Sequence, residues 1–506
     1  MPATAFKAIL IGTSETIAQA HKQLAAMAEP THIVGCLLAD STRSETAGGL
    51  TVLGTLDDLG AIRTTYEVCT AIVTLPAAMC QAISTVRSAL RQNGYVERFL
   101  PPLAELLTQA PPYPVGLATG STGAGWGVPR IDIADLIGRS PHGMDRQSVE
   151  RILTGKRILL TGAGGSIGSE LCRIVASFKP QMLILMERSE NALFEIDRQI
   201  AGRFPDIPRR AILHDVTDAD QTLRHLIDLK PHVVFHAAAH KHVPLMEDHP
   251  AHAVANNLFG TKSIADASVA VGAERFVMIS SDKAVNPTSV MGATKRLAEL
   301  YIQSLAKAAT DTGGTRTQCS MVRFGNVLGS ACSVLTIWSA QLAEGGPISV
   351  TDPRMTRFFM TIPEAATLVI QAAAIDTDPA TAHTYVLDMG EPIPILDLAK
   401  RFVAAHGFFP RVENEDEPNS SGLPPMNIQV TGVRPGEKLH EELAYNAEQL
   451  NPTPHSGINA WAGDAAHRNT LAMIAELSAV RSGANHAAVI EAIRRHVPEM
   501  VPAAVS

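Results

Sequence analysis

Residues 157–168 read RILLTGAGGSIG, and this stretch decides the fold. Its apolar first part, Arg157–Thr161, predicts a buried strand, and Ser169–Ser177 beyond it has the apolar spacing of a helix. The glycines between them keep the turn tight and leave out side chains that would block a phosphate. The helix N-terminus then offers free N–H groups and a positive dipole end, so we expect a dinucleotide-binding turn. Its predicted contacts are Gly162, Gly165, Ser166, Ile167 and Gly168.

The next predicted strand supplies residues that would recognise the adenosine half of the dinucleotide. Met182–Met186 is apolar and ends at Glu187. A carboxylate there accepts hydrogen bonds from ribose hydroxyls and repels a 2′-phosphate, so we expect NAD. Arg188 could contact a 2′-phosphate instead, which leaves NADP as the alternative. After a further strand, Asp215 and Val216 are placed to meet the adenine, although Asp215 could instead cap the helix that follows it.

Small residues follow a third strand of the predicted parallel sheet. Val233–His236 leads into Ala237 and Ala238, which would let a flat cofactor lie close to the backbone. The carboxyl ends of parallel strands meet at one edge of the sheet, where open α/β sheets bind their ligands. We therefore expect Ala237 and Ala238 to contact the same dinucleotide as the glycine turn.

The side chains that could carry chemistry follow a fourth strand, Arg275–Ile279. A hydroxyl, a carboxylate and an amine come directly after it, and a second lysine lies on the next predicted helix. These groups would gather at the ligand-binding edge of the sheet, although Asp282 and Lys283 could instead form a surface ion pair. The candidate catalytic residues are Ser281, Asp282, Lys283, Met291 and Lys295, and Lys295 is also a candidate contact of the cofactor.

The bulk composition limits the classes of function. The 506 residues are 46% hydrophobic and 18% charged, with a net charge of −8, as in an ordinary globular protein. No basic tract points to nucleic acid, and no cysteine or histidine spacing points to a metal site. No uninterrupted apolar stretch is long enough to span a bilayer. We expect a protein of the cytoplasm or of the inner face of the cell membrane.

Two α/β regions are separated by a loop-rich stretch. Strands at Lys7–Gly12, His32–Leu38 and Cys69–Leu75 alternate with helical segments, which indicates a parallel sheet covered by helices. The first turn of this region lacks glycines placed for a phosphate, so docking or regulation is its preferred role. The predicted division is an accessory domain at 1–110, a linker at 111–150, a catalytic domain with a substrate subdomain at 151–450, and a helical tail at 451–506.

Several motifs of the catalytic region together resemble a known family. They are TGAGGSIGSE (161–170), AAAHKHVPLME (237–247), NNLFGT (256–261), SDKAVNPTSVMGATK (281–295), RFGNVLG (323–329), TRFFMTIPE (356–364), LDMGE (387–391) and GVRPGEKL (432–439). The region from about residue 155 to 443 resembles the extended short-chain dehydrogenase/reductases. Within them it is most similar to the UDP-N-acetylglucosamine 4,6-dehydratases of polysaccharide biosynthesis. The resemblance implies a Rossmann domain with a smaller C-terminal substrate-binding subdomain, after an N-terminal Rossmann-like domain.

The resemblance also implies a reaction. NAD⁺ takes a hydride from C4 of a UDP-sugar, water is lost across C5 and C6, and the hydride returns at C6. Asp282 would act as the acid and Lys283 as the base, with the pKa of Lys283 lowered by burial or by Lys295. Ser281 would hydrogen-bond the C4 oxygen. The implied substrate contacts are Lys241, Asn326, Arg357 and Arg434, and Arg434 could instead pair with Glu437. Related enzymes associate, so we expect a homo-oligomer.

The chain departs from the family pattern at three points. Met291 stands where many members carry a catalytic tyrosine, and a thioether cannot take a proton from a hydroxyl. Ala331 and Cys332 replace a basic residue and a glycine in a substrate loop. The long members usually begin with transmembrane helices, which this sequence does not show. A nucleotide-sugar epimerase and a non-catalytic dinucleotide sensor remain as alternatives, but the presence of Asp282 and Lys283 favours neither.

Overall fold

The computed structural model describes residues 7–25, 32–39, 44–76, 79–100, 136–138, 140–311, 317–377, 382–413, 415, 418–419, 423–445, 450–461, 469–482 and 485–501. The chain divides into two compact units. Unit 1 comprises Met1–Asp132, Val334–Val350 and Asp397–Thr431, and unit 2 comprises Ile133–Ser333, Thr351–Leu396 and Gly432–Ser506.

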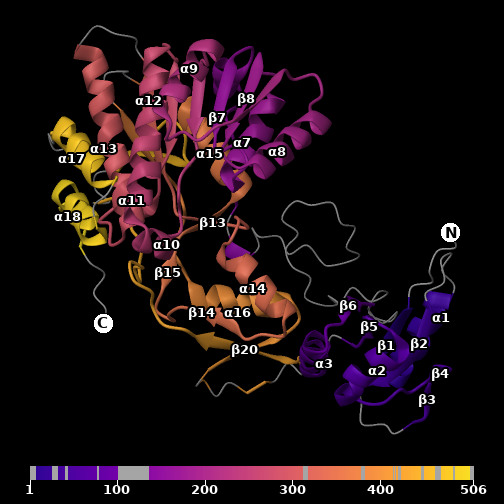
Figure 1. Ribbon diagram of the computed structural model, residues 1–506. Coiled ribbons are helices and arrows are strands. Elements are labelled where there is room, and N and C mark those ends of the chain that lie inside the picture. The colour runs from indigo at the N-terminus through magenta and orange to yellow at the C-terminus, as the bar shows by residue number, and fades with distance from the viewer. Residues whose placement is uncertain are drawn as a thin grey trace. The chain divides into compact units, whose positions relative to one another are not determined.

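Unit 2 is built on a nine-stranded sheet with the order β21-β22-β17-β12-β11-β10-β7-β8-β9 (Figure 1). The strands from β9 to β17 are parallel, and β22 and β21 run antiparallel at one end. The strands are β7 (Arg157–Thr161), β8 (Met182–Glu187), β9 (Arg209–Leu213), β10 (Val233–His236), β11 (Arg275–Ile279), β12 (Gln318–Arg323), β17 (His383–Leu387), β21 (Leu450–Pro452) and β22 (Ile458–Trp461). This arrangement confirms the expected α/β Rossmann fold.

Helices cover both faces of this sheet (Figure 1). They are α6 (Arg146–Leu153), α7 (Ser166–Ser177), α8 (Glu190–Arg203), α9 (Ala219–Leu229), α10 (Val243–Asp248), α11 (Pro250–Ala253), α12 (Thr261–Ala270), α13 (Val290–Asp311), α15 (Ile362–Ala373), α17 (Thr470–Val480) and α18 (His486–His496). A π-helical segment, Val254–Gly260, joins α11 to α12, and Asp282–Ala284 forms a 3₁₀ turn. Short ladders pair β13 (Asn326–Leu328) with β16 (Phe359–Thr361), and β15 (Thr356–Arg357) with β18 (Ile393–Pro394).

Alternate residues of each central strand point into two separate cores. Ile158 and Leu160 of β7 pack with α6, α7, α8 and α15, whereas Leu159 packs with α9, α12, α13, α17 and α18. All three side chains are fully buried. A parallel strand covered on both faces must be apolar at consecutive positions, which is why RILLT reads as a continuous apolar run.

The element boundaries agree closely with the sequence. The strands predicted at Arg157–Thr161, Val233–His236 and Arg275–Ile279 are confirmed to the residue, and the apolar stripes of the tail lie in α17 and α18. The helix after the glycines begins at Ser166, three residues earlier than expected. Most of the expected linker falls outside the described residues. Its end is helical, because Asp145 accepts hydrogen bonds from the first turn of α6.

The described part of unit 1 contains two parallel sheets, besides a short antiparallel pair of Thr46–Ala47 with Leu50–Thr51. One has the order β2-β1-β5-β6, and the other has the order β14-β20-β19. Their elements are β1 (Lys7–Gly12), α1 (Ser14–Ala25), β2 (His32–Leu38), β3 (Thr46–Ala47), β4 (Leu50–Thr51), α2 (Leu59–Tyr66), β5 (Thr70–Thr74), α3 (Cys80–Gln92), β6 (Val96–Phe99), α14 (Val334–Ala343), β14 (Ile348–Val350), α16 (Ile395–Ala405), β19 (Phe409–Val412) and β20 (Pro425–Val430). The turn after β1 is closed by Thr16, whose hydroxyl donates to Thr13 and Thr74 carbonyls.

Two absences bear on function, and both concern the described ranges only. No helix there has the length and apolar character needed to cross a membrane. No group of three or more His, Cys, Asp or Glu side chains there is arranged to hold a metal ion.

A buried ionic cluster lies between the sheet and α13. Glu299 of α13 accepts hydrogen bonds from Arg323 of β12 at 2.7 and 2.6 Å and from Ser280 at 2.7 Å, and Arg296 donates to it at 3.1 Å. Glu299 and Arg323 are both fully buried. Although burial alone would raise the pKa of Glu299, the Arg323 guanidinium, with Arg296 and the Ser280 hydrogen bond, outweighs it and lowers this pKa to about 2. The cluster therefore fixes the ends of β11 and β12 against α13.

Replacing Glu299 by Gln should destabilise the protein strongly. Arg323 would keep a buried charge with no counter-ion, and such a loss costs about 3–5 kcal/mol in the free energy of unfolding. Urea denaturation at neutral pH measures this. Because the folded-state pKa lies below the ordinary value of 4.5, the difference from wild type should be full above that pH and shrink as the pH falls toward 2. Glu195→Gln, which removes an exposed ion pair with Arg198, is the matched control and should leave the denaturation midpoint unchanged.

Candidate active site

The glycine turn brings strand β7, helix α7 and the end of β10 close together. Gly162 has a φ of +63°, and a Cβ there would lie 2.7 Å from the nitrogen of Ala238 and 2.8 Å from the carbonyl of Ala237. A Cβ at Gly168 would collide with the carbonyl oxygen of Gly162. Helix α7 begins after Gly165, which has no side chain to cap the first N–H groups. Those groups are therefore available to an anionic ligand.

A cavity of about 210 Å³ opens beside this turn. It brings together eight of the twelve predicted cofactor contacts, which are Gly162, Gly165, Glu187, Arg188, Asp215, Val216, Ala237 and Ala238. Four others of its lining residues escaped the sequence reasoning, namely Met186, His214, Ala239 and Asn256. Ser166, Ile167, Gly168 and Lys295 do not line it. The Ser166 hydroxyl instead accepts a hydrogen bond from the backbone of Ala331 at 3.0 Å.

The acidic residue at the end of β8 is held by its own turn. Glu187 accepts hydrogen bonds from the backbone N–H groups of Gly164, Arg188 and Ser189. The guanidinium of Arg188 lies 4.0 Å from the carboxylate of Asp215 and donates to Asn256 at 3.3 Å. The carboxylates of Glu187 and Asp215 and the guanidinium of Arg188 therefore lie together at this end of the cavity.

The helix-cap alternative for Asp215 is wrong. Asp218 caps α9 through a hydrogen bond from the backbone of Gln221. Asp215 instead accepts bonds from the N–H and hydroxyl of Thr217, in a local turn.

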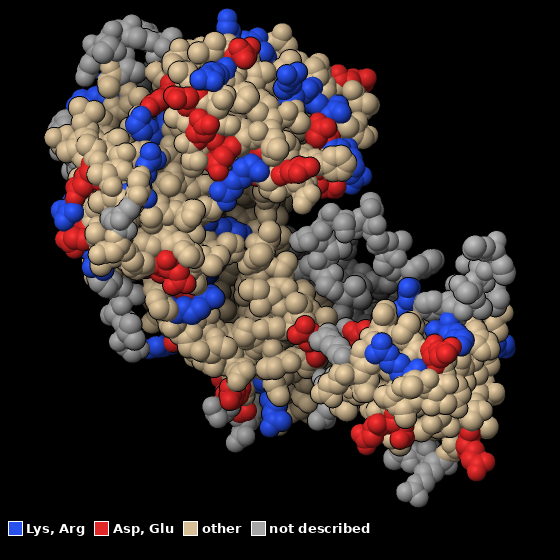
Figure 2. Space-filling view, viewed as in Figure 1, with Lys and Arg blue, Asp and Glu red and all other residues tan. Residues whose placement is uncertain are grey.

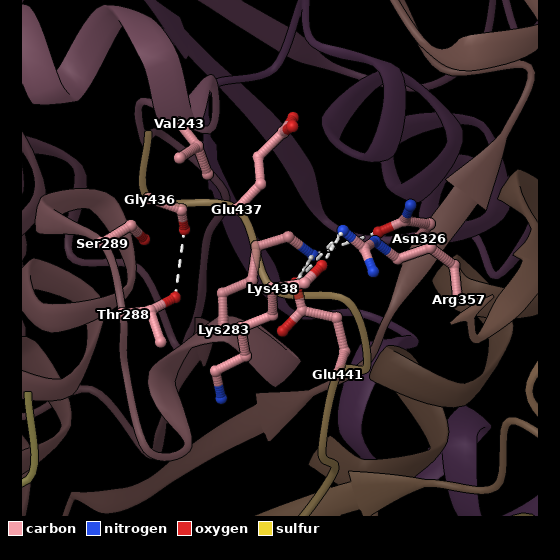
Figure 3. Close-up of a pocket in the computed structure, with 10 residues that line it drawn as sticks. All are labelled: Val243, Lys283, Thr288, Ser289, Asn326, Arg357, Gly436, Glu437, Lys438 and Glu441. Atoms are coloured by element: carbon pink, nitrogen blue, oxygen red, sulfur yellow. Dashed lines mark hydrogen bonds and ion pairs between the residues drawn. The ribbon is translucent and has the colours of Figure 1, made fainter. Parts of the chain in front are cut away.

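The candidate catalytic residues follow β11, at its carboxyl end. Ser281 donates to Asp282 Oδ1 at 2.8 Å, and Lys283 Nζ donates to the same oxygen at 2.9 Å and to Asn326 Oδ1 at 3.1 Å. Asp282 is fully buried. Lys283 and Asn326 line a second cavity, of about 130 Å³ (Figure 3). The alternative that Asp282 and Lys283 form a surface ion pair is therefore wrong.

The expected lowering of the Lys283 pKa is also wrong. Burial by itself lowers the pKa of this ammonium group, but its acidic neighbours, Asp282 first and Glu441 second, outweigh burial and raise it above its ordinary value. Lys283 is thus an ammonium at rest and must pass its proton to a neighbour before it can act as a base.

Lys295 is the lysine whose pKa is lowered. Its Nζ donates to the carbonyl of Ile279 at 2.6 Å, and its side chain is buried. Burial, opposed only in part by Glu299, lowers the pKa of Lys295 to about 8. The predicted contact between Lys295 and the nicotinamide ribose stays a prediction.

Met291 is a packing residue. It lies in the first turn of α13, is 3% exposed, and belongs to the apolar core on that side of the sheet. Asn257, in the π-helical segment, bonds the backbone of His240 and the hydroxyl of Thr294. It therefore holds α13 in place next to Lys295, and it lines neither of the two cavities.

Two of the four predicted substrate contacts line the 130 Å³ cavity, and two do not. Asn326 and Arg357 line the 130 Å³ cavity, and Arg357 also donates to the carbonyls of Lys438 and Leu439 at 2.8 and 3.1 Å. Lys241 lies elsewhere and donates to the carbonyl of Ala331 at 2.8 Å. Arg434 confirms its alternative, because it pairs with Glu437 at 2.6 Å and is 61% exposed.

The 130 Å³ cavity is also lined by residues that sequence reasoning did not predict. Three come from the middle of the chain, Val243, Thr288 and Ser289, and four come from the C-terminal segment, Gly436, Glu437, Lys438 and Glu441. Glu441 Oε1 lies 3.8 Å from Lys283 Nζ and 3.9 Å from Arg357 (Figure 3). The one available signal was position, since Glu441 stands two residues beyond the GVRPGEKL motif.

Charged side chains of both signs are interspersed over unit 2 on the face shown in Figure 2. An anionic substrate would therefore be recognised by local cations at the cavities and not by a broad positive surface.

The tight turn makes a sharp prediction about ligand binding. Gly168→Ala forces the turn apart, and overpacking of this kind costs about 1–3 kcal/mol, so the affinity for NAD should fall about tenfold or more. Isothermal titration of each variant with NAD measures it. Gly202→Ala is the control, since a Cβ there meets nothing within 4 Å. Equal NAD affinities for the two variants would contradict the assignment of the turn.

Comparison with known proteins gives consistent matches. The profile of a family described as "Polysaccharide biosynthesis protein" matches residues 158–462. The probable polysaccharide biosynthesis protein EpsC of Bacillus subtilis is 39% identical over 458 residues, which are 89% of this chain and 71% of EpsC. The capsular polysaccharide biosynthesis protein CapD of Staphylococcus aureus is 44% identical over 64% of this chain, which spans half of CapD.

Two further matches are shorter. The UDP-N-acetylglucosamine 4,6-dehydratase (inverting) of Campylobacter jejuni serotype O:23/36 is 30% identical over 57% of this chain and 78% of its own length. The crystal structure of Pen from Bacillus thuringiensis is 31% identical, with a TM-score of 0.54, over 63% of this chain and 91% of Pen. The family match covers more than half of the sequence, and the chain belongs to the polysaccharide biosynthesis protein family.

Proposed function

We propose that this protein is a UDP-N-acetylglucosamine 4,6-dehydratase that forms a UDP-4-keto-6-deoxy-N-acetylhexosamine for the synthesis of a surface polysaccharide or glycan. The observation that carries the proposal is the buried Asp282–Lys283 pair at the end of β11, beside a helix that presents Met291. Dehydration needs proton transfer at C5 and C6, which an acid–base pair supplies. The similarity to the Campylobacter dehydratase supports the same reaction class.

The residues around the glycine turn fit a nicotinamide dinucleotide. Gly162 and Gly165 would leave room for the pyrophosphate, and Ala237 and Ala238 would flank the cofactor. Glu187 would accept hydrogen bonds from the ribose hydroxyls. The pairing of Arg188 with Asp215 favours NAD over NADP. A bound dinucleotide supplies the hydride acceptor for C4 and gives the hydride back at C6.

The chain's own groups manage the protons. Ser281 would hydrogen-bond the C4 oxygen, and its hydroxyl donates a hydrogen bond to Asp282. Lys283 becomes the base for the C5 proton once its ammonium proton passes to an adjacent carboxylate, of which Asp282 Oδ1 at 2.9 Å is the nearer. The C5 proton is acidic only after C4 is oxidised, because the carbanion is then an enolate.

The substrate's diphosphate needs cations. Arg434 is exposed and could exchange its pairing with Glu437 for a phosphate, and Arg357 holds a buried charge at the cavity wall. Lys241 and Asn326 complete the proposed set of substrate contacts. The planar fork of arginine suits two phosphate oxygens at once.

The reaction itself can be followed directly. Purified protein incubated with UDP-N-acetylglucosamine in D₂O should give a 4-keto-6-deoxy sugar by proton NMR, with deuterium at C5 and no net accumulation of NADH. The configuration at C5 of the product separates retention from inversion. Absence of the 4-keto-6-deoxy sugar would contradict the dehydratase, and a C4 or C5 epimer in its place would favour an epimerase.

Substitutions of Asp282 or Lys283 should lower kcat, whereas a substitution of Met291 on α13 should not. Asp282→Asn and Lys283→Met each remove a proton-transfer group, so kcat should fall by about a hundredfold or more. Met291→Leu, which keeps the volume of a core residue that carries no proton, should retain most of the activity. The rates of product formation in the same NMR assay measure kcat for each variant. If Met291→Leu lost activity while the other two variants kept it, the proton-transfer groups would lie on α13 and not at Asp282 and Lys283.

A further inference from the structure

The proposed reaction leaves one proton unassigned, and this inference rests on that proposed function. Hydroxide is a poor leaving group, so the C6 hydroxyl must be protonated as its bond to carbon breaks. The resemblance gives that role to Asp282. Asp282 Oδ1, however, already accepts hydrogen bonds from Ser281 and from the ammonium of Lys283. Asp282 is also the group that receives the Lys283 proton, and it does not line the 130 Å³ cavity.

Glu441 is a second carboxyl group at the same cavity. Its side chain is 3% exposed, and it lies within 4 Å of both Lys283 and Arg357. Figure 3 shows these side chains converging on it from separate segments of the chain. The two distances, 3.8 Å and 3.9 Å, are longer than hydrogen bonds. The Glu441 carboxyl therefore lies near two cations but is hydrogen-bonded to neither.

One oxygen of this carboxyl has nothing to bond. Glu441 Oε2 is buried and has no hydrogen-bond partner among the described residues. A buried polar atom left unpaired costs free energy, and native proteins rarely retain one without a function. Since Glu441 lines the cavity, a hydroxyl of a bound sugar is a chemically suitable partner for that oxygen.

The charges around Glu441 decide its protonation. Asp282 and Glu441 share the ammonium of Lys283, and two carboxyl groups in one buried site do not both ionise readily. Burial, opposed in part by Lys283 and assisted by Asp282, raises the pKa of Glu441 above its ordinary value. Among the described residues, Asp282 Oδ2 and Glu441 Oε2 are both buried without a hydrogen-bond partner, but of these two carboxyl groups only Glu441 lines the cavity in which a sugar hydroxyl would receive the proton.

We propose that Glu441 is the general acid that protonates the C6 hydroxyl as it leaves. The C6–O bond breaks with its electron pair on oxygen, that oxygen takes the Glu441 proton, and water departs. Lys283 takes the C5 proton and later returns one to C5. The proton released from the C4 hydroxyl during oxidation restores the Glu441 carboxyl, so protons balance over the cycle.

A substrate with a leaving group that needs no acid tests this role. UDP-6-fluoro-6-deoxy-N-acetylglucosamine loses fluoride without protonation and gives the same 4-keto-6-deoxy product. Glu441→Gln should lower kcat on the natural substrate by about a hundredfold or more, but by less than about tenfold on the fluoro substrate. Wild-type kcat should also fall at high pH, as Glu441 loses its proton, for the natural substrate only.

The neighbouring residue provides the control. Glu442 is more exposed and bonds Asn286 and Lys438, so Glu442→Gln should match wild type on both substrates. Glu441→Asp keeps the carboxyl and should show a smaller loss with the same fluoro rescue, which covers a Gln variant that fails to fold. Equal losses on both substrates, or high-pH limbs that coincide in wild type, would overturn the role of Glu441. A wild type that forms no 4-keto-6-deoxy sugar from either substrate would instead refute the proposed function.

Discussion

The ion pair between Glu299 and Arg323 is the constraint on which the site depends. Both side chains are fully buried, and the Arg323 guanidinium lies 4.7 Å from the ring centre of Trp461 in β22. Desolvating two charges is costly, and hydrogen bonds from Arg296 and Ser280 offset that cost only in one arrangement of the strands and α13. Because Ser280 precedes the catalytic pair and Glu299 follows Lys295 by one helical turn, this arrangement sets where the reactive groups meet.

Two lysines show how the environment decides chemistry that residue type leaves open. The side chain of Lys283 is 20% exposed and Lys295 is 4% exposed, and removal from water by itself lowers the pKa of each. Lys283 is also adjacent to two carboxyl groups, which reverse the effect, whereas Lys295 bonds a neutral carbonyl and keeps the lowered value. Lys283 therefore carries a transferable proton held between acceptors. Lys295 has the weaker hold on its charge and is fixed to the end of β11.

The sequence predicted the parts of the molecule that are set by local pattern. The apolar runs located β7, β10 and β11 to the residue, since a doubly covered parallel strand has few alternative registers. The gathering of eight predicted cofactor contacts around one cavity beside the glycine turn followed from the same logic, and their contact with a cofactor stays a prediction. The place of Glu441 did not follow from that logic, because it lies on a segment about 160 residues further along the chain than Lys283. The direction of the Lys283 pKa shift was missed because it depends mainly on how closely the neighbouring Asp282 carboxylate packs against the ammonium group. Arg434 pairs with Glu437, a close neighbour in sequence, and its contact with substrate stays a prediction.

That distant segment is fixed by its backbone more than by its side chains. Arg357 donates to the carbonyls of Lys438 and Leu439, Lys438 donates to Val285, and Thr288 donates to Gly436. Two of these bonds to main-chain oxygens hold the segment against the loop that follows the catalytic pair, and two hold it against β15, whatever side chain stands at 441. A carboxyl at that position is thus not required by the fold, and its cost as a buried, incompletely bonded acid must be balanced elsewhere. Met291 offers no proton acceptor on the helix side of the site. A carboxyl at position 441 gives the site a proton-transfer group that does not depend on α13.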